Sequence, residues 1–460
     1  MLTFKSSAVT TTPLLFALYL LGMLCLPIAS FEMYRDLPDS TISVLGNALA
    51  FENPWNRGAM LGGYAIVAAC IVGAIQLSRR SVTSSNEKPR SSLFRSMSAW
   101  DAVLATWISA PTVTGFFNPS PIAEDLWQSL YIAIAWGGPY LAGRVLVSST
   151  DDLRRSLWVV FAAGAVSLVP ALVEFASGRF VYQALYGYNP YQSIGESRWF
   201  GYRPILWFED PNQVAMWWMT IAVTAMGLIP AWFVASKTVG LKWVAMGLPF
   251  LFQGVGSAIL TIIGALAMHV RRISSWKYWI AGTLVLGGIL FLARGPVLQA
   301  SRELARQSGI EEVVKSILRE SSLGSFGWRL AREEQDSNLW KEHPITGSGS
   351  VMFWSDAGQS QRPWGMFSLV TSAYGCIGSG ILLWMLFGPL VTSLFIRRRG
   401  DHNEAIDNEA IDTVQKSVPV LIALHGLDGM INSAFFLPIL WLYGAWVTNQ
   451  SPPAVGAARE

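Results

Sequence analysis

The sequence has few charged residues and few cysteines. Asp, Glu, Lys and Arg make up 14% of its 460 residues, whereas 52% of them are hydrophobic. A soluble globular protein of this size needs more polar surface, so the composition excludes one and predicts an integral membrane protein. Cys25, Cys70 and Cys376 all lie in apolar runs, where they form neither a metal-ligand cluster nor an evident disulfide framework.

Several motifs of soluble enzymes are also missing. The sequence contains no Walker A, GxGxxG, HExxH or CxxC pattern, which argues against a soluble nucleotide-driven enzyme. The net charge of +3 is small and scattered among loops, so it does not indicate a nucleic-acid partner. No repeat of fixed period is present either.

Long apolar runs are what the sequence does have. Because an apolar run of about 20 residues suffices for a helix to cross a bilayer, they predict an all-α polytopic membrane protein with about twelve transmembrane helices. The runs cover residues 13–30, 58–76, 98–117, 125–147, 158–178, 214–236, 240–256, 257–270, 276–293, 365–396, 418–427 and 431–447. The first run could also be a signal peptide ending at residues 28–30, but its cleavage pattern is poor and we expect a retained helix.

Basic residues between these runs alternate as the positive-inside rule requires. The basic residues of every second connection fall on one side of the membrane if both termini are cytoplasmic. These residues are Arg79, Arg80, Lys88, Arg90, Arg95, Arg154, Arg155, Lys237, Lys242, Arg271, Arg272, Lys277, Arg397, Arg398 and Arg399. The outer side then receives residues 31–57, a turn near Asn118, residues 179–212 and a long polar segment, so functional groups are expected there.

The runs divide the chain into four parts. Residues 1–294 hold the first nine helices, residues 295–364 form a large extracytoplasmic loop, residues 365–448 hold the last three helices, and residues 449–460 form a cytoplasmic tail. We interpret residues 400–417, which contain a small EAID duplication, as a solvated cytoplasmic linker.

The large extracytoplasmic loop has the pattern of two amphipathic helices. Apolar residues recur at helical spacing at positions 310, 313, 314, 317 and 318, with charges between them. Gly324 ends this pattern, and a second helix is expected over residues 326–342. Pro344, Gly347 and Gly349 then predict a return to loop structure. Long loops of this kind carry function more often than not.

Two arginines stand beside aromatic residues in the outer loop that precedes residue 214. They are Arg198 and Arg203, and Trp207 and Phe208 follow closely. A guanidinium makes two parallel charged hydrogen bonds to a phosphate and keeps its proton. We therefore interpret Arg203, and less strongly Arg198, as ligands of a lipid diphosphate. The alternative is that both arginines pair with carboxylates and so fold the loop. Those carboxylates are Glu196, Glu209 and Asp210.

A helix is expected to begin at the end of this loop. Asp210 and Asn212 flank Pro211, and proline suits the first turn of a helix. One of the two flanking residues is therefore expected to cap the helix.

The large loop offers a second set of polar groups, namely Arg329, Arg332, His343 and Arg362. His343 could act as a general base near neutral pH. The alternative is that it is a surface residue, as a lone loop histidine more often is.

Ionisable residues inside the predicted membrane region are costly unless they are paired or face a cavity. Glu174, His425 and Asp428 are such residues. His425 and Asp428 are three positions apart and share one helical face, so we expect them to hydrogen-bond to each other.

This layout resembles the O-antigen ligase and O-antigen polymerase superfamily. The resemblance rests on about twelve helices, on the spacing of Arg203 and Asn212 before a helix, and on a long outer loop reading GWRLAREEQDSNLWKEHPITGSGS. In that family the loop runs from an arginine, through a tryptophan, to a Pro-x-x-Gly-x-Gly turn. The matching positions here are Arg329, Trp340, Pro344, Gly347 and Gly349.

The sequence departs from the family pattern at two places. Ligases of the family carry a His-Asn pair where Trp364 and Gly365 stand here, and a Ser-Arg pair where residues 255–256 read Val-Gly. Polymerases of the family are described by arginines in the third and fifth outer loops, where Arg203 and Arg329 or Arg332 lie. The resemblance therefore implies a polymerase rather than a ligase.

The resemblance implies a metal-independent glycosyltransferase of the bacterial inner (cytoplasmic) membrane, multi-pass, with its active site on the outer face. Its donor would be an oligosaccharide linked to a polyprenyl (undecaprenyl) diphosphate, and its acceptor a glycan or another lipid-linked unit. The product would be a surface polysaccharide such as O-antigen or exopolysaccharide. No cofactor is expected, and a chain-length regulator, other glycan-assembly proteins and membrane lipids are the expected partners.

Roles in this reaction can be assigned to particular residues. Arg203 and Arg329 would neutralise the departing diphosphate, and the base would be one of Glu209, Asp210 and His343. Substrate binding is expected of Arg198, Asn212, Trp207, Arg332 and Trp364, the two tryptophans by stacking on sugar rings.

Three other functions remain open. A ligase would transfer a finished glycan to lipid A core or to a protein. A transporter of another class would also fit twelve helices with ionisable residues in the membrane. A family member without activity could act as a scaffold for glycan assembly.

Overall fold

Helices are the only extended secondary structure in the described part of the chain. The computed structural model describes residues 11–25, 98–117, 122–147, 149–179, 181, 184, 201–208, 211–229, 237–252, 254–269, 343–349, 365–395, 405–430 and 438–450. Within these ranges no β-sheet is formed, as the predicted all-α class requires. Two helices, Thr150–Ser177 and Met366–Ser393, are long and apolar enough to cross a membrane. The total of about twelve spanning helices stays a prediction.

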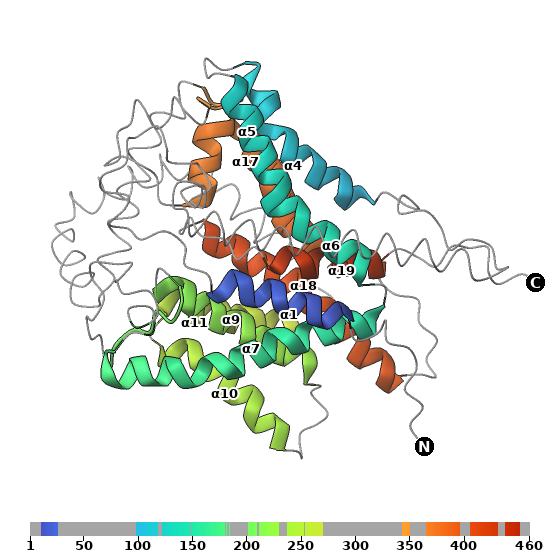
Figure 1. Cartoon of the computed structure of the whole chain (residues 1–460). Coiled ribbons are helices and arrows are strands. Elements are labelled where there is room, and N and C mark those ends of the chain that lie inside the picture. The colour runs from blue at the N-terminus through green and yellow to red at the C-terminus, as the bar shows by residue number, and fades with distance from the viewer. Residues whose placement is uncertain are drawn as a thin grey trace, which may run out of the picture.

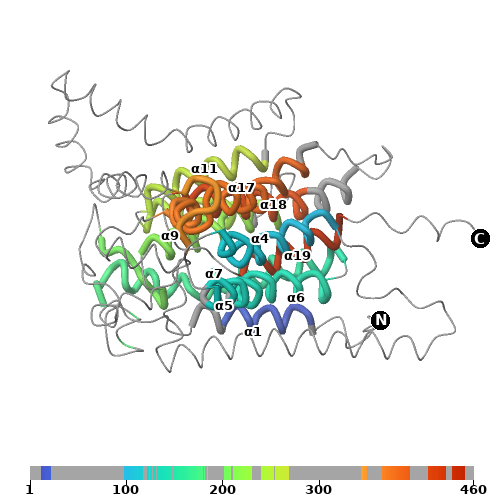
Figure 2. Tube along the Cα trace, turned by 90° about the horizontal axis from the view of Figure 1, so that it is seen from above, coloured from blue at the N-terminus to red at the C-terminus, as the bar shows by residue number. Residues whose placement is uncertain are grey.

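The helices form one bundle (Figure 1). In chain order they are α1 (Thr11–Cys25), α4 (Ala99–Gly115), α5 (Ile122–Ile132), the π-helical turn η3 (Ala133–Gly137), α6 (Gly138–Leu146), α7 (Thr150–Ser177), α9 (Pro211–Leu228), α10 (Lys237–Leu251), α11 (Val255–His269), α17 (Met366–Phe395), α18 (Ala405–Gly429) and α19 (Ile439–Gln450). Seen from above, α1 and α11 lie on opposite sides of the bundle (Figure 2). The predicted runs at 58–76 and 276–293 lie outside the described residues.

The prediction of a solvated linker over residues 400–417 is wrong from Ala405 onward, because α18 begins there. Its first turns continue the helix that holds the apolar run after Pro419. Val414 and Ser417 are buried, three positions apart on one face. Gln415 donates a hydrogen bond from Nε2 to the Thr150 hydroxyl, 3.1 Å away, at the start of α7. These contacts pack residues 414–417 against the bundle.

Helix α9 is the most deeply buried helix of the described bundle. Every residue from Val214 to Leu228 is buried, and the helix contacts α7, α10, α11 and α18. A helix that is apolar on all sides is stable only when other helices surround it. The sequence thus places α9 in the interior, and its N-terminal end fixes where the preceding loop must come.

Outward faces of the peripheral helices are apolar. Val166 and Val169 of α7 are 73% and 67% exposed, and Leu266 of α11 is 58% exposed. Large contiguous apolar surfaces are rare on soluble monomers. Such faces are what lipid-exposed helices present to a bilayer, and they fit the predicted membrane location.

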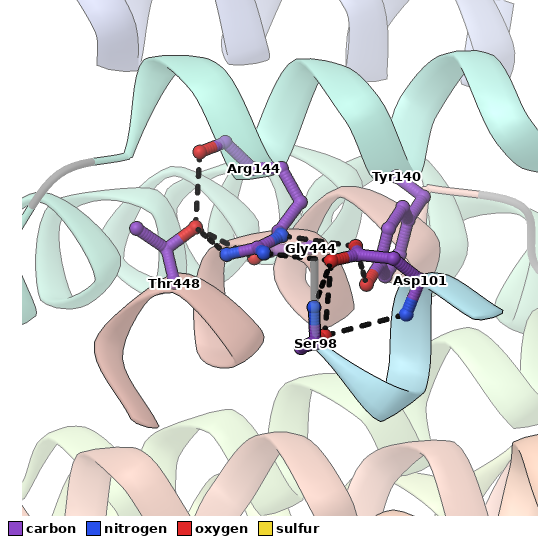
Figure 3. Close-up of polar contacts among 6 residues, drawn as sticks. All are labelled: Ser98, Asp101, Tyr140, Arg144, Gly444 and Thr448. Carbon is purple, nitrogen blue, oxygen red and sulfur yellow. Dashed lines mark hydrogen bonds and ion pairs between the residues drawn. The ribbon is translucent and has the colours of Figure 1, made fainter. Parts of the chain in front are cut away.

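A polar cluster joins α4, α6 and α19 at one end of the bundle (Figure 3). Arg144 makes a two-pronged ion pair with Asp101, at 3.1 Å from Nε to Oδ1 and 2.8 Å from Nη2 to Oδ2. The Tyr140 hydroxyl donates to the same carboxylate at 2.7 Å, and Arg144 Nη1 donates to Thr448 at 3.2 Å. Ser98 caps α4 and its backbone N–H also reaches Asp101, at 2.7 Å. With so many partners, both charges are held in a mostly buried position.

Helices α6 and α19 cross at two glycines. A Cβ atom on Gly143 would contact the Trp441 carbonyl, and one on Gly444 would contact the Tyr140 carbonyl. Small residues let helix backbones approach this closely, which is a common way for helices to associate in membranes. The crossing therefore requires glycine at both positions.

We expect Gly143→Ala to destabilise the protein, because its new methyl group would meet backbone atoms that cannot move aside. Overpacking of this kind costs about 1–3 kcal/mol, measurable as a lower midpoint of thermal unfolding in detergent. Gly247→Ala in α10 is the matched control, since a Cβ there has open space around it. Equal midpoints for both variants would refute the close crossing.

Candidate functional site

The candidate site is organised by Glu174, which lies near the C-terminal end of α7 and is fully buried. Its carboxylate accepts three backbone hydrogen bonds, from Val181 N at 2.6 Å, Ile205 N at 2.7 Å and Leu206 N at 2.8 Å. Val181 lies four positions after the end of α7, whereas the other two residues precede α9. One side chain thus ties both ends of the loop that connects the two helices. Hydrogen bonds to a charged acceptor are the strong ones.

Close backbone contacts fit the same loop onto α7. Gly178 ends the helix in the left-handed conformation at φ 65°, and its N–H bonds to the Glu174 carbonyl. The Tyr202 N–H then bonds to the Phe175 carbonyl at 3.1 Å. Gly201 lies so close to the Phe175 ring that an added Cβ would be 2.7 Å from it. Glycines at 178 and 201 therefore allow residues 201 and 202 to pack closely against the end of α7.

Leu206 has a strained backbone, with φ of 52°. A non-glycine residue in this region is uncommon and costs of order 1–3 kcal/mol. The bond from its N–H to Glu174 and the complete burial of its side chain offset that cost. Such outliers cluster at functional sites.

Arg203 and Asn212 are brought together by this arrangement. Arg203 is half-buried, and its Nη2 donates to Asn212 Oδ1 at 3.0 Å. Helix α9 begins at Pro211, as the proline predicted, so Asn212 lies in its first turn. The guanidinium is thereby held beside the positive end of the α9 helix dipole. A helix N-terminus and a guanidinium both favour an anion.

Trp207 is half-buried and packs against the hydrophobic core. Its neighbour Phe208 is 7% exposed and closes a turn back to the Ile205 carbonyl at 2.8 Å. The predicted role of Trp207 in stacking on a sugar stays a prediction.

His343 is exposed and begins a short turn that docks on α17. Within the turn, Gly347 N bonds to the His343 carbonyl at 2.9 Å. Four backbone hydrogen bonds then join the turn to α17: Ser348 N to Ser372 O at 2.8 Å, Gly349 N to Ala373 O at 3.1 Å, Cys376 N to Pro344 O at 2.9 Å and Ile377 N to Ile345 O at 3.4 Å. The predicted loop at Pro344, Gly347 and Gly349 is confirmed.

The turn fits a break in α17 at Gly375, where φ is 63° and ψ is −161°. A Cβ on Gly375 would contact the Ile345 carbonyl, and a Cβ on Gly347 would contact the backbone of Ala373. The break frees backbone groups that a helix would otherwise pair, and the turn pairs them again. Irregular backbone at membrane depth is tolerated only under such conditions.

Sequence reasoning missed two of these features. The run at 365–396 was expected to be one continuous helix, and the only signal of a break was the glycine-rich stretch around Gly375. Glu174 was identified as an ionisable group in an apolar run, but its role in holding the arginine loop was not predicted. His425 is buried and hydrogen-bonds to the Thr220 hydroxyl across to α9, with 2.9 Å between Nε2 and Oγ1.

Six of the predicted site residues lie outside the described residues. They are Arg198, Glu209, Asp210, Arg329, Arg332 and Trp364. Among the residues that the structure does describe, no group of three or more His, Cys, Asp or Glu could hold a metal ion. Whether the reaction is metal-independent stays a prediction.

No model of a known protein family matches the chain, and no curated protein matches it in sequence. Membership of the O-antigen ligase and polymerase superfamily therefore stays a prediction that rests on the motifs quoted above.

We expect Glu174→Gln to loosen the loop between α7 and α9, because an amide would offer N–H groups to backbone donors. Each hydrogen bond lost to the charged group is worth about 1.5–3 kcal/mol. Hydrogen exchange at the Val181, Ile205 and Leu206 amides should become much faster. Asp151→Asn, on an exposed residue in the first turn of the same helix, is the control. Unchanged exchange at all three amides would contradict this role of Glu174.

We expect Gly375→Ala to undock the Pro344–Gly349 turn, since the new Cβ would strike the Ile345 carbonyl. The exchange of the Cys376 and Ile377 amides should then rise, and the unfolding midpoint should fall. Gly380→Ala, in the same helix with open space at its Cβ, should leave both quantities unchanged. If the two variants behave alike, the contact between the Pro344–Gly349 turn and α17 does not stabilise the break at Gly375.

Proposed function

We propose that the protein is a membrane glycosyltransferase that polymerises polyprenyl-diphosphate-linked saccharide units in the biosynthesis of a surface polysaccharide. The observation that carries this proposal is the Arg203 guanidinium, which Asn212 holds at the N-terminal end of the buried helix α9. A fixed cation at a helix N-terminus suits a diphosphate group. A lipid-linked donor would bring that group to the end of a helix bundle.

The reaction is a displacement at the anomeric carbon of the donor. The acceptor hydroxyl oxygen forms a bond to this carbon, the bond from the carbon to the diphosphate oxygen breaks, and the diphosphate leaves with an additional negative charge. Arg203 and the α9 dipole would stabilise that charge. The hydroxyl proton passes to a base, for which Glu209, Asp210 and His343 are the candidates.

Preorganisation is the contribution of Glu174 to this mechanism. A cation that must be oriented during the reaction stabilises the leaving group less than one already in place. The three bonds from the loop backbone to Glu174 hold the segment that carries Arg203 before any substrate arrives. Surroundings of low dielectric constant would strengthen the attraction between the Arg203 guanidinium and the diphosphate further.

A ligase of the same superfamily would use the same donor group, and gene loss separates the two activities. Loss of a polymerase leaves single repeat units on the final acceptor. Loss of a ligase instead leaves full-length chains on the carrier lipid.

A transporter is the second candidate, and the break in α17 is the observation that favours it. Discontinuous helices form the substrate sites of many transporters. In this protein the freed backbone groups at the break bond to the Pro344–Gly349 turn. Substrate-dependent uptake into vesicles by the purified protein, without glycan synthesis, would favour transport.

We expect Arg203→Ala to reduce polymerisation about 100-fold or more, since removal of one such charge-stabilising donor typically costs this much. In cells that make a polymeric surface glycan, the variant should shift the chain-length distribution to single repeats. Arg179→Ala is the control, because Arg179 is an exposed arginine that follows the same end of α7. Normal chain lengths with Arg203→Ala at normal protein levels would exclude Arg203 from the mechanism.

A further inference from the structure

A second polar cluster involves α4, α5 and α17, in which α4 packs against both of the other helices and lies between them in Figure 2. We call it the Asp125 cluster, and it consists of Trp107, Asp125, Gln128 and Tyr374. Trp107, Asp125 and Tyr374 are completely buried, and Gln128 is 7% exposed. The function proposed above uses none of these residues.

Ring contacts and a close helix approach hold the cluster together. The Trp107 ring lies 6.4 Å from the Tyr374 ring and 5.7 Å from the Trp136 ring, centroid to centroid. The Asp125 carboxylate packs on Gly115, where a Cβ would collide with it, and lies within electrostatic reach of the Tyr374 hydroxyl. Gln128 follows one turn after Asp125 on the same face of α5.

The cluster is close to an end of the bundle. Gly115 is the last residue of α4, and the next residue, Phe116, is 72% exposed.

Three polar groups of the cluster have no hydrogen-bond partner among the described residues. They are the Trp107 Nε1–H, the Gln128 Oε1 and the Tyr374 hydroxyl. Buried polar groups are nearly always satisfied, so each unsatisfied group calls for an explanation. Three of them around one buried carboxylate point to a missing ligand.

Two backbone irregularities adjoin the same cluster. Trp136 belongs to the π-helical turn η3, and Tyr374 directly precedes the break at Gly375. Single π-helical turns occur frequently at functional sites. An ionisable residue within a membrane segment is itself a default functional hypothesis.

The unpaired groups restrict the chemistry of the ligand. Trp107 can only donate, Gln128 Oε1 can only accept, and the Tyr374 hydroxyl can do both. A metal cation cannot accept from the indole, a fully ionised phosphate cannot donate to the amide oxygen, and an acyl chain can do neither. A hydroxyl group can satisfy all three, and the aromatic rings add apolar faces for the ring of a sugar.

We propose that the Asp125 cluster binds hydroxyl groups of the saccharide, at a subsite separate from the Arg203 loop. The inference rests on the proposed function and extends it, because it assigns the diphosphate and the sugar to different residues. Water carries the same hydroxyl chemistry, and a cluster that holds only water is the outcome that would overturn the proposal.

A second tyrosine and a second tryptophan with unpaired polar groups lie in α19. The Tyr443 hydroxyl and the Trp446 Nε1 also have no partner among the described residues. Among the described residues, no unpaired amide oxygen such as that of Gln128 lies beside them. Tyr443 thus supplies a matched control for Tyr374, since both are buried tyrosines.

The test compares two ligands and three proteins. Lipid-linked saccharides extracted from the cells that make the protein are one probe. The same lipid fraction after mild acid, which splits the sugar from the phosphate, and after removal of free sugar is the other. Dissociation constants are measured by titration of each probe into wild type, Tyr374→Phe and Tyr443→Phe in detergent. Both variants should fold, because loss of an unpaired hydroxyl is nearly neutral or stabilising.

We expect wild type to bind the intact fraction more tightly than the acid-treated one. Tyr374→Phe should bind the intact fraction about fivefold more weakly, the effect of one lost hydrogen bond, and the acid-treated fraction as wild type does. Tyr443→Phe should match wild type with both probes. The sugar subsite alone is overturned by either of two results. In the first, Tyr374→Phe prefers the intact fraction over the acid-treated one as strongly as wild type does. In the second, wild type shows no preference for the intact fraction. Binding of neither probe by wild type overturns the proposed function and the subsite with it.

Discussion

The buried carboxylate of Glu174 is the constraint on which the candidate site depends. In a low-dielectric interior an uncompensated carboxylate is very costly, so the backbone must supply donors to it. It does so from both sides of one loop, and Leu206 adopts a strained conformation to contribute its N–H. That arrangement positions Arg203 against Asn212 at the start of α9. The proposed position of the diphosphate thus depends on the backbone hydrogen bonds that the buried Glu174 carboxylate requires.

The same requirement explains the other irregular features. At Gly375 the broken helix leaves backbone groups open, and the turn from Pro344 to Gly349 pairs them. Between the regular helices α6 and α19, Gly143 and Gly444 allow the two backbones to come into direct contact. The Asp125 cluster differs from both, because three of its polar groups find no partner among the described residues. These three groups lie around one buried carboxylate, which makes the cluster a candidate for ligand binding.

The sequence located the apolar part of helices such as α4 and α17 but not the irregularities, for physical reasons. Apolar runs of helix length are a strong local signal, so α4 and α17 begin and end within about two residues of the predicted runs. The break at Gly375 depends on a turn distant in the sequence, and glycine alone does not reveal it. The partners of Glu174 lie up to 32 residues away, beyond any local pattern. At residues 405–417, repeated acidic residues suggested solvent, whereas buried positions such as Val414 extend α18.

The central claim is that Arg203 binds the diphosphate of a lipid-linked donor. Its most direct test is an experimental structure of the protein with a bound polyprenyl diphosphate, in which the distance from the Arg203 guanidinium to the diphosphate oxygens is measured. We expect at least one nitrogen–oxygen distance of about 2.7–2.9 Å, typical of a charged hydrogen bond, at the N-terminal end of α9. A diphosphate bound elsewhere, with Arg203 still directed only at Asn212, would contradict the account.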